Sequence, residues 1–149
     1  MVVILKTKVI ALEREKDSKS NHRAPNFGYL EGNMKAIESE ERPWGRFFVI
    51  HDQPTYKLKR IEVDPGGRLS YQFHHKRSEA WTIIDGVGEI TLNGKTKEYK
   101  AGETILIPQG VKHRIENKKS EKIVFIEVQT GTYFGEDDIV RIKDDYNRV

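Results

Sequence analysis

The chain has 149 residues, which suits one domain with a single core, and its 26 basic and 23 acidic residues leave a net charge of +3. The two signs are interspersed, as in KTKEYK and ENKKSEK, which is typical of a solvated surface and argues against a nucleic-acid partner. Because the chain has no cysteine, disulfides and thiolate chemistry are excluded.

Residues 1–41 carry the weakest pattern of the chain. The opening run MVVILKTKVIALE is broken at Lys6, is too short to cross a bilayer and lacks a small-residue cleavage site. We therefore expect a cytoplasmic protein without a membrane partner. Val2–Leu5 and Val9–Leu12 are expected to form a strand or the arms of a hairpin, and Met34–Glu41 a short helix. This N-terminal arm either lies at the periphery or adds a strand to a neighbouring subunit.

Residues 42–149 are predicted to form one domain made almost entirely of strands. Short segments that alternate or run apolar are separated by turns rich in Pro, Gly, Asp and Asn, and this spacing predicts an antiparallel sandwich or barrel. Asn93-Gly94, between two alternating segments, is the strongest hairpin signal. The expected strands are Phe47–His51, Tyr56–Asp64, Arg68–His74, Glu79–Asp85, Gly88–Leu92, Lys95–Tyr99, Thr104–Ile107, His113–Asn117 and Lys122–Gln129.

Residues of metal-binding type gather in and after the segment LSYQFHHKRSEAW. In a strand, residues i and i+2 point to one face, so Gln72 and His74 share a face while His75 points to the other. Glu79 opens the next predicted strand, and His113 ends the segment GETILIPQGVKH. Imidazole and carboxylate ligands suit zinc, iron, manganese or nickel. The pattern predicts that Gln72, His74, Glu79 and His113 converge on one divalent cation, with His75 replacing His74 if the strand bulges.

The spacing of these residues resembles the two motifs of the cupin superfamily, with Gln72 where most cupins carry a histidine. The first motif is matched by Gly66, Gln72, His74, Glu79 and Gly86, and the second by Gly102, Pro108, Gly110, His113 and Asn117. RPWG, LSYQFHHKRSEAW and EVQTGTYFGEDDIVR are further similar to the type II mannose-6-phosphate isomerase domain. That domain is usually the C-terminal part of a bifunctional isomerase and mannose-1-phosphate guanylyltransferase. The resemblance covers about Arg42 to Arg148.

The resemblance implies an all-β cupin fold, a double-stranded β-helix or jelly-roll barrel, with an N-terminal arm and a short C-terminal tail or helix. It implies an enzyme that interconverts mannose 6-phosphate and fructose 6-phosphate in GDP-mannose and polysaccharide biosynthesis. The implied partners are a small sugar phosphate, a second copy of the chain in a homodimer, and one divalent metal. Zinc is expected first, with manganese, cobalt, nickel and iron as alternatives. Because no glycine-rich nucleotide-binding loop is present, guanylyltransferase activity is not expected of this chain.

Two other functions fit the same residues. One is a non-catalytic cupin that binds a sugar phosphate, and the other is a different metal-dependent cupin enzyme, such as a dioxygenase or another sugar isomerase. A neutral amide ligand leaves the metal more electropositive, which favours Lewis-acid work over redox work and hence isomerisation.

The candidates for phosphate binding are Lys59, Arg77 and Arg141. Arginine suits bidentate phosphate contacts, and Arg77 lies between the ligand-bearing strands, where the resemblance also places a functional arginine. Lys59 shares a strand face with apolar residues, so it either lines a cavity or extends outward to solvent. Arg141 comes from the tail, and Arg148 matches a family arginine near the end of the chain.

Isomerisation also needs a base that reaches a carbon-bound proton. Glu136 and Asp137, in the tail that begins GEDD, are preferred for this role together with Arg77 as a catalytic cation. Asp138, Glu127 and His75 are the alternatives, and Asp137 or Asp138 also qualifies as the cap of a short terminal helix. Lys76 and Ala80 replace histidines that are usual in the family, neither of them at a predicted ligand position; activity is expected to change if the histidine at 80 serves acid–base chemistry.

Overall fold

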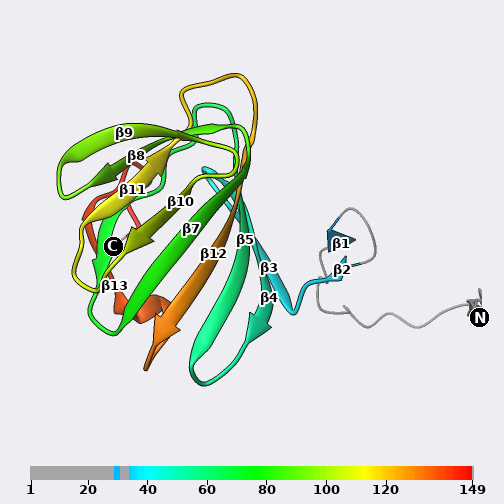
Figure 1. Ribbon diagram of the computed structural model, residues 1–149, viewed down its shortest axis with the longest axis vertical. Helices are drawn as coiled ribbons and strands as arrows, with labels where there is room; N and C mark the ends of the chain where they lie inside the picture. Colours follow the sequence, from blue (N-terminus) through cyan, green and yellow to red (C-terminus); the bar gives the residue numbers. More distant parts are fainter. Residues whose placement is uncertain (1–28, 31–33, 149) are drawn as a thin grey trace, which may run out of the picture.

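A computed structural model describes residues 29–30 and 34–148 of the chain. The structure is an all-β barrel in which two antiparallel sheets face each other (Figure 1). The larger sheet has the order β10 (Thr104–Ile107), β7 (Arg77–Asp85), β12 (Ile123–Gly131), β5 (Tyr56–Val63), β4 (Gly45–Asp52) and β3 (Glu38–Arg42). The smaller sheet has the order β13 (Ile139–Lys143), β6 (Tyr71–His74), β11 (His113–Glu116), β8 (Val87–Leu92) and β9 (Lys95–Lys100). A separate short pair joins β1 (Tyr29–Leu30) to β2 (Met34–Lys35).

The expected all-β architecture of two facing antiparallel sheets is confirmed. Each of the nine predicted strands is present, from β4 to β12, with ends that differ by a few residues. The predicted hairpin at Asn93-Gly94 joins β8 to β9, and both residues have positive φ, 45° and 81°. Positive φ at both central positions is the requirement of a type I′ turn, which asparagine and glycine meet at low cost.

The helix expected at Met34–Glu41 is wrong. The segment instead contains β2 and the edge strand β3, which pairs with β4 from Glu38 opposite Val49 to Arg42 opposite Gly45. The run of glutamates suits a charged, exposed edge strand as well as a helix, and pairing with β4 decides the outcome. The predicted arm strands in residues 1–28 lie outside the described residues.

The tail forms a short 3-10 turn, η1 (Glu136–Asp138), followed by β13. No side chain caps this turn, so neither Asp137 nor Asp138 has the capping role considered from the sequence. β13 pairs with β6 in the smaller sheet, with Arg141 opposite Gln72. The tail thus becomes part of the barrel wall beside the strand that carries Gln72 and His74.

The core lies between the two sheets and grades into a polar region. On the inner face of β7, Trp81 and Ile83 are buried and apolar, whereas Glu79 and Arg77 are buried and charged. The inner faces of β12 and β5 change from apolar to polar in the same way. In β12, Phe125 is followed by Glu127 and Gln129; in β5, Val63 and Ile61 lie at the apolar end and Lys59 at the polar end. The register places Phe125 opposite Ile83, Glu127 opposite Trp81, and Gln129 opposite Glu79. The polar ends of three adjacent strands therefore meet at one end of the barrel.

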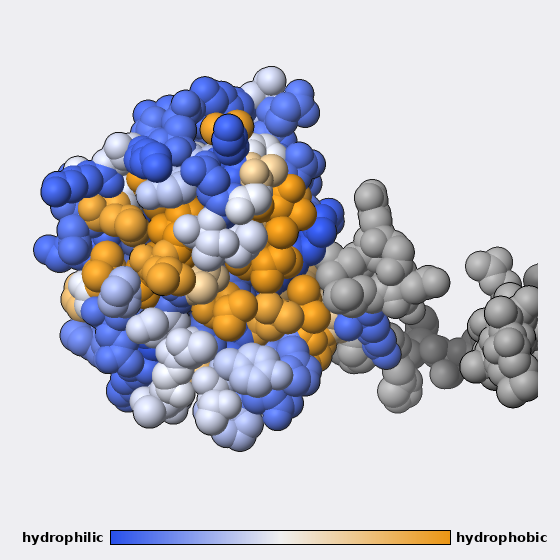
Figure 2. Space-filling view, in the orientation of Figure 1, coloured by the Kyte–Doolittle hydropathy of each residue, from blue (hydrophilic) through white to orange (hydrophobic). Residues whose placement is uncertain are grey.

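The surface of the described residues is charged over most regions but not all. Six large apolar side chains are exposed, namely Ile37, Ile84, Leu106, Tyr133, Val140 and Ile142. Figure 2 shows apolar side chains gathered in a band across the middle of the visible face, between charged regions. Within residues 29–30 and 34–148, no helix has the length and the apolar character needed to cross a bilayer.

Candidate functional site

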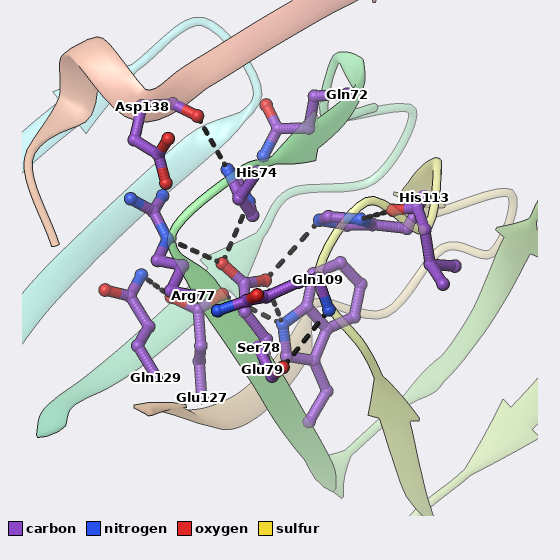
Figure 3. Close-up of polar contacts among 12 residues, drawn as sticks. Gln72, His74, Arg77, Ser78, Glu79, Gln109, His113, Glu127, Gln129 and Asp138 are labelled. Atoms are coloured by element: carbon purple, nitrogen blue, oxygen red, sulfur yellow. Dashed lines mark hydrogen bonds and ion pairs between the residues drawn. The ribbon is translucent and has the colours of Figure 1, made fainter. Parts of the chain in front are cut away.

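Two histidines and a glutamate meet in the buried polar region. His74 ends β6, Glu79 lies in β7 and His113 begins β11, and the three are 2%, 5% and 1% exposed. The Nε2 atom of His74 lies 3.0 Å from Glu79 Oε1, and the Nε2 atom of His113 lies 3.4 Å from Glu79 Oε2 (Figure 3). One ligand atom from each residue lies within 4.8 Å of the others. We call these three residues the His-Glu-His cluster.

Backbone carbonyls orient both imidazoles. His113 Nδ1 lies 2.8 Å from the Val111 carbonyl oxygen, and His74 Nδ1 lies 3.4 Å from that of Asp138. A proton on Nδ1 that is donated to a carbonyl leaves the lone pair of Nε2 directed at Glu79. The indole of Trp81 packs edge-on against the His113 ring, with centroids 5.3 Å apart, so the apolar core holds the ring in place.

The donor set of the cluster fits a cation. Both Nε2 atoms are buried and accept no hydrogen bond from the described residues, and both face a carboxylate that also only accepts. Burial alone would raise the pKa of Glu79, but His113 and His74 outweigh it and hold that pKa well below its usual range. Burial lowers the pKa of His113, and Glu79 more than reverses the effect. Three converging electron-pair donors of this kind are satisfied by a proton or by a divalent metal.

Gln72, the fourth predicted ligand, lies beside the cluster in a different arrangement. Its Oε1 atom accepts a hydrogen bond of 2.5 Å from Ser70 Oγ. Figure 3 shows the amide nitrogen of Gln72 nearer to His74 than the amide oxygen is. The structure therefore brings His74, Glu79 and His113 together, while the oxygen of Gln72 is engaged by Ser70. His75 is exposed and lies edge-on to Phe73, away from the cluster, as the strand alternation predicts.

A cavity with an empty volume of about 520 Å³, partly open to solvent, adjoins the cluster. Its lining includes Gln72 and Glu79 together with five cationic side chains: Arg42, Lys59, Arg77, Arg141 and Arg148. Five apolar residues and the polar side chains of Ser70, Glu127, Gln129 and Glu136 complete the wall, and such a mixture is usual in a small-molecule site. A cationic cavity of this kind suits an anionic ligand.

The three cations expected from the sequence all line this cavity. Lys59 is 6% exposed, and its Nζ atom lies 3.0 Å from Glu136 Oε1. Arg77 donates from Nε to Glu79 Oε1 at 3.2 Å and from Nη1 to the Gly135 carbonyl at 3.0 Å. Arg141 Nε is buried and has no hydrogen-bond partner in the described part of the chain.

Arg77 reaches its position because β12 ends in a glycine. A Cβ at Gly131, whose φ is 156°, would lie 2.2 Å from the Lys76 carbonyl oxygen and 2.9 Å from Arg77 Cα. Only a residue without a side chain allows β12 and β7 to approach so closely at this point. Lys76 itself is exposed, with its Nζ atom 4.8 Å from the centre of the Tyr133 ring, and neither Lys76 nor Ala80 lines the cavity.

The candidate bases are placed very differently. Glu136 lines the cavity with 48% of its side chain exposed; its partial burial raises the pKa, but Lys59 and then Arg77 and Arg42 bring the net pKa below the usual value. Asp137 is exposed, accepts a 2.6 Å hydrogen bond from the Tyr133 hydroxyl and is not part of the cavity lining. Asp138 is buried and accepts hydrogen bonds from the backbone amides of His75 and Lys76, so it supports the loop before β7.

Glu127 is, beside Glu79, a buried carboxylate of the cavity wall. It is 5% exposed and accepts hydrogen bonds from Trp81 Nε1 at 2.9 Å and from Gln129 Nε2 at 2.6 Å. The same indole N–H also lies 3.0 Å from Glu79 Oε2, so Trp81 links the two carboxylates. Burial, followed by the negative charge of Glu79, raises the pKa of Glu127 to about 7. From the sequence, Glu127 was expected only as an alternative base.

Among the residues of the site, Arg42, Ser70, Trp81 and Gln129 were not identified from the sequence. Ser70 and Gln129 line the cavity, and Trp81 bridges Glu79 and Glu127. Strand alternation offers a signal for three of them, because Trp81 shares a face with Glu79, and Gln129 shares one with Glu127. Ser70 likewise shares a face with Gln72 in the predicted strand Arg68–His74.

The family match and the similar proteins of known name agree on one family. The chain matches the family described as "Mannose-6-phosphate isomerase C-terminal" over residues 31–144. A mannose-1-phosphate guanylyltransferase of Klebsiella pneumoniae is 38% identical over 152 residues, which cover 99% of this chain and 32% of that protein. One of Salmonella montevideo is 45% identical over 121 residues, covering 80% of this chain and 26% of that protein. The chain thus spans about a third of the length of these relatives or less.

Solved structures support the fold. The capsular polysaccharide assembling protein CapF of Staphylococcus aureus has a TM-score of 0.62 at 21% identity, covering 71% of this chain and 32% of that one. A double-stranded β-helix protein of Klebsiella pneumoniae has a TM-score of 0.59 at 21% identity, covering 65% of this chain and 83% of that one. A cupin domain of Schizosaccharomyces pombe has a TM-score of 0.56 at 18% identity, covering 58% and 64%. With the family match, the chain belongs to the mannose-6-phosphate isomerase C-terminal family and has the cupin fold.

Proposed function

We propose that this protein is a metal-dependent mannose-6-phosphate isomerase. The observation that carries the proposal is that one cavity combines three chemical elements. Glu79 of the His-Glu-His cluster, the cations Lys59, Arg77 and Arg141, and the buried carboxylate of Glu127 all line it. Membership in the mannose-6-phosphate isomerase C-terminal family supports the same reaction and substrate. Fold alone would not, because cupin-like barrels host many unrelated functions.

The residues that would hold the metal are His74, Glu79 and His113, with Gln72 as the fourth ligand. Zinc remains the first expectation, because two imidazoles and a carboxylate form a common zinc donor set. When bound, a divalent metal polarises a carbonyl and stabilises the negative charge that develops on the sugar oxygens. To bind the metal, the Oε1 atom of Gln72 would have to give up the hydrogen bond that it accepts from Ser70.

The cavity cations would bind the phosphate group. Arg141 is the strongest candidate because its buried Nε has no partner among the described residues, and an arginine fork matches phosphate oxygens. Lys59 is already paired with Glu136, so a phosphate dianion would have to compete with that carboxylate for the ammonium group. Arg77, which contacts Glu79, would act between the phosphate and the reacting end of the sugar.

We assign the proton transfer to Glu127. A base that works near neutral pH needs a pKa close to 7, and burial gives Glu127 that property while Lys59 keeps Glu136 a weak base. Trp81 and Gln129 fix the Glu127 carboxylate from two sides. Glu127 would remove the proton from one of the two reacting carbons and return it to the other. Glu136 is the second candidate.

A coupled assay for fructose 6-phosphate formed from mannose 6-phosphate tests the proposal. Protein stripped with a chelator is given single metals, and Glu127→Gln is measured beside a His75→Ala control. We expect turnover that needs metal, that falls by about 100-fold or more in Glu127→Gln, and that persists in the control. Sugar-phosphate binding without turnover by any metal form would contradict the proposal and favour a non-catalytic binding protein.

The homodimer and the cytoplasmic location expected from the sequence remain predictions. Light scattering on the purified protein decides the first, since a mass of one chain would contradict it.

A further inference from the structure

Gln129 has a buried carbonyl oxygen that nothing in the described structure satisfies. The residue is 1% exposed, lies in β12 and lines the cavity. Its Nε2 atom donates a hydrogen bond of 2.6 Å to Glu127 Oε1, but its Oε1 atom has no hydrogen-bond partner among the described residues. Leaving a buried acceptor without a donor is costly, so such a group in a cavity wall indicates a missing partner.

The ionised form of Glu127 determines the direction of the Gln129 amide. An amide has donors on one side and acceptors on the other, and a carboxylate in its ionised form only accepts. Glu127 therefore requires the nitrogen of Gln129 to face it, and the carbonyl oxygen faces away (Figure 3). The neighbouring cations do not supply the missing donor, because Lys59 donates to Glu136 and Arg77 donates to Glu79 and to the Gly135 carbonyl.

The position of β12 in the sheet indicates which part of a ligand would reach this oxygen. β12 lies between β7, which carries Glu79 of the His-Glu-His cluster, and β5, which carries Lys59. Gln129 is directly opposite Glu79 in the register, and Glu127 is opposite Lys59. A sugar phosphate with its reacting carbons at the cluster and its phosphate among the cations would place its middle carbons over β12.

We propose that Gln129 is a specificity-determining residue whose carbonyl oxygen accepts a hydrogen bond from the hydroxyl group on C3 or C4 of the substrate. This inference rests on the proposed function for its choice of a hexose 6-phosphate. A hydroxyl is the donor of suitable chemistry, since it is neutral and does not disturb the charge balance between Glu127 and the cations. A site built to bind a hydroxyl rejects analogues that lack it, because the protein acceptor is then left unpaired.

The test compares mannose 6-phosphate with its 3-deoxy and 4-deoxy analogues in the wild-type protein and in Gln129→Met. Methionine has nearly the same length and accepts only a weak hydrogen bond. Both kcat/KM and the dissociation constant from calorimetry are measured. Gln109→Met is the matched control, because Gln109 is exposed and is not part of the cavity lining. Gln129→Asn, which shortens the side chain by one methylene, serves if Gln129→Met does not fold.

The ratio of the values for mannose 6-phosphate and for its analogues, taken within each protein, distinguishes a direct hydrogen bond to the substrate from an effect of Gln129 on the position of Glu127. We expect the wild type and Gln109→Met to prefer mannose 6-phosphate over one of the two analogues by roughly 10- to 100-fold. We expect this preference to fall to within about threefold in Gln129→Met. A general loss of activity in Gln129→Met through Glu127 would affect all three compounds equally and leaves the ratio unchanged.

The outcomes for the inference and for the proposed function differ. Equal preference ratios in the wild type and Gln129→Met would overturn the inference, even if the wild type is an active isomerase. A wild type that binds mannose 6-phosphate with a Gln129-dependent preference but never turns it over would support the inference and contradict the isomerase. Failure of the wild type to bind the sugar phosphate at all would overturn both.

Discussion

At the scale of single residues, the site is defined by acceptors that face one another. Two imidazole nitrogens and a carboxylate converge from β6, β11 and β7, and the charges of the cavity wall surround them. Each of the three residues has an orienting contact: carbonyls hold His74 and His113, and Trp81 with Arg77 holds Glu79. Holding these acceptors together lowers the stability of the metal-free protein, and binding of a cation restores that stability.

Removal of one cluster residue is therefore expected to abolish metal binding. His113→Ala and Glu79→Gln should each reduce the bound zinc from about one ion per chain to near zero after dialysis, since each removes one of the three strong donors and leaves the neutral amide of Gln72 as a weak one. His75→Ala, which removes an exposed histidine, should keep the full content. Metal analysis of the dialysed proteins measures this. Retention of stoichiometric zinc by His113→Ala would place the metal elsewhere.

Glu127 predicts the pH dependence of the reaction. Burial and then the charge of Glu79 raise its pKa to about 7, so the carboxylate is protonated below that pH and becomes a base above it. A cation bound at Glu79 neutralises the negative charge that contributes to this rise, so it moves the midpoint of the pH profile to a lower pH. We expect kcat/KM to rise with pH through a midpoint at or below about 7. Steady-state assays from pH 5 to pH 9 check this, and a rate that is flat over the range would exclude Glu127 as the base.

At the scale of elements, strand register assembles the site. The inner faces of β7, β12 and β5 are apolar at one end and polar at the other, and antiparallel pairing aligns the polar ends. β13 then places Arg141 opposite Gln72, and η1 brings Glu136 to Lys59. A register shift of one residue in β12 would turn both Glu127 and Gln129 to the outside, so pairing and function depend on the same contacts.

Another buried carboxylate, Glu62 in β5, joins strands without taking part in the cavity. It contacts Arg46 at 2.7 Å, Arg60 at 3.1 Å and Lys122 at 3.2 Å. Burial raises the pKa of Glu62, but the hydrogen bonds from Arg46, Lys122 and Arg60 outweigh it and lower the net pKa. A carboxyl whose pKa is lowered by folding stabilises the fold above its unfolded pKa, and this contribution is lost as the pH falls through the folded pKa.

Glu62→Gln should accordingly destabilise the protein at pH 7 by about 1–3 kcal/mol, because charge-assisted hydrogen bonds become neutral ones. The difference from the wild type should shrink as the pH is lowered below about 4, where the wild-type carboxyl begins to be protonated. Urea unfolding at pH 7 and at low pH measures both values. A destabilisation that does not change with pH would show that packing, and not charge, is responsible.

The secondary structure was largely predictable because its signals are local. Alternation and the turn residues located β4 to β12, and Asn93-Gly94 located a hairpin. Glu38–Arg42 and Ile139–Lys143 form strands only because they pair with β4 and β6. For the same reason the sequence pattern favoured Glu136 over Glu127 as the base, since the pKa values of the two carboxyl groups depend on burial and on neighbours distant in the sequence.

At the scale of the whole molecule, a barrel of two sheets leaves a polar cavity at one end of an apolar core. The apolar core contacts the His-Glu-His cluster through Trp81, which packs against His113. The tail contributes Glu136, Arg141 and Arg148 to the cavity wall. This arrangement suits a small anionic substrate, and family membership makes that substrate a hexose 6-phosphate in our proposal. The proposed function therefore depends on one activity.

The most direct test of that activity is nuclear magnetic resonance of the sugar phosphates in deuterated water with zinc-loaded protein. We predict that mannose 6-phosphate and fructose 6-phosphate each convert to the same equilibrium mixture. Deuterium should enter at the carbon that receives the transferred proton, because a carboxylate base exchanges its proton with solvent. Glu127→Gln should leave both compounds unchanged over the same time. If the wild-type protein converts neither compound with any divalent metal, the isomerase assignment is contradicted.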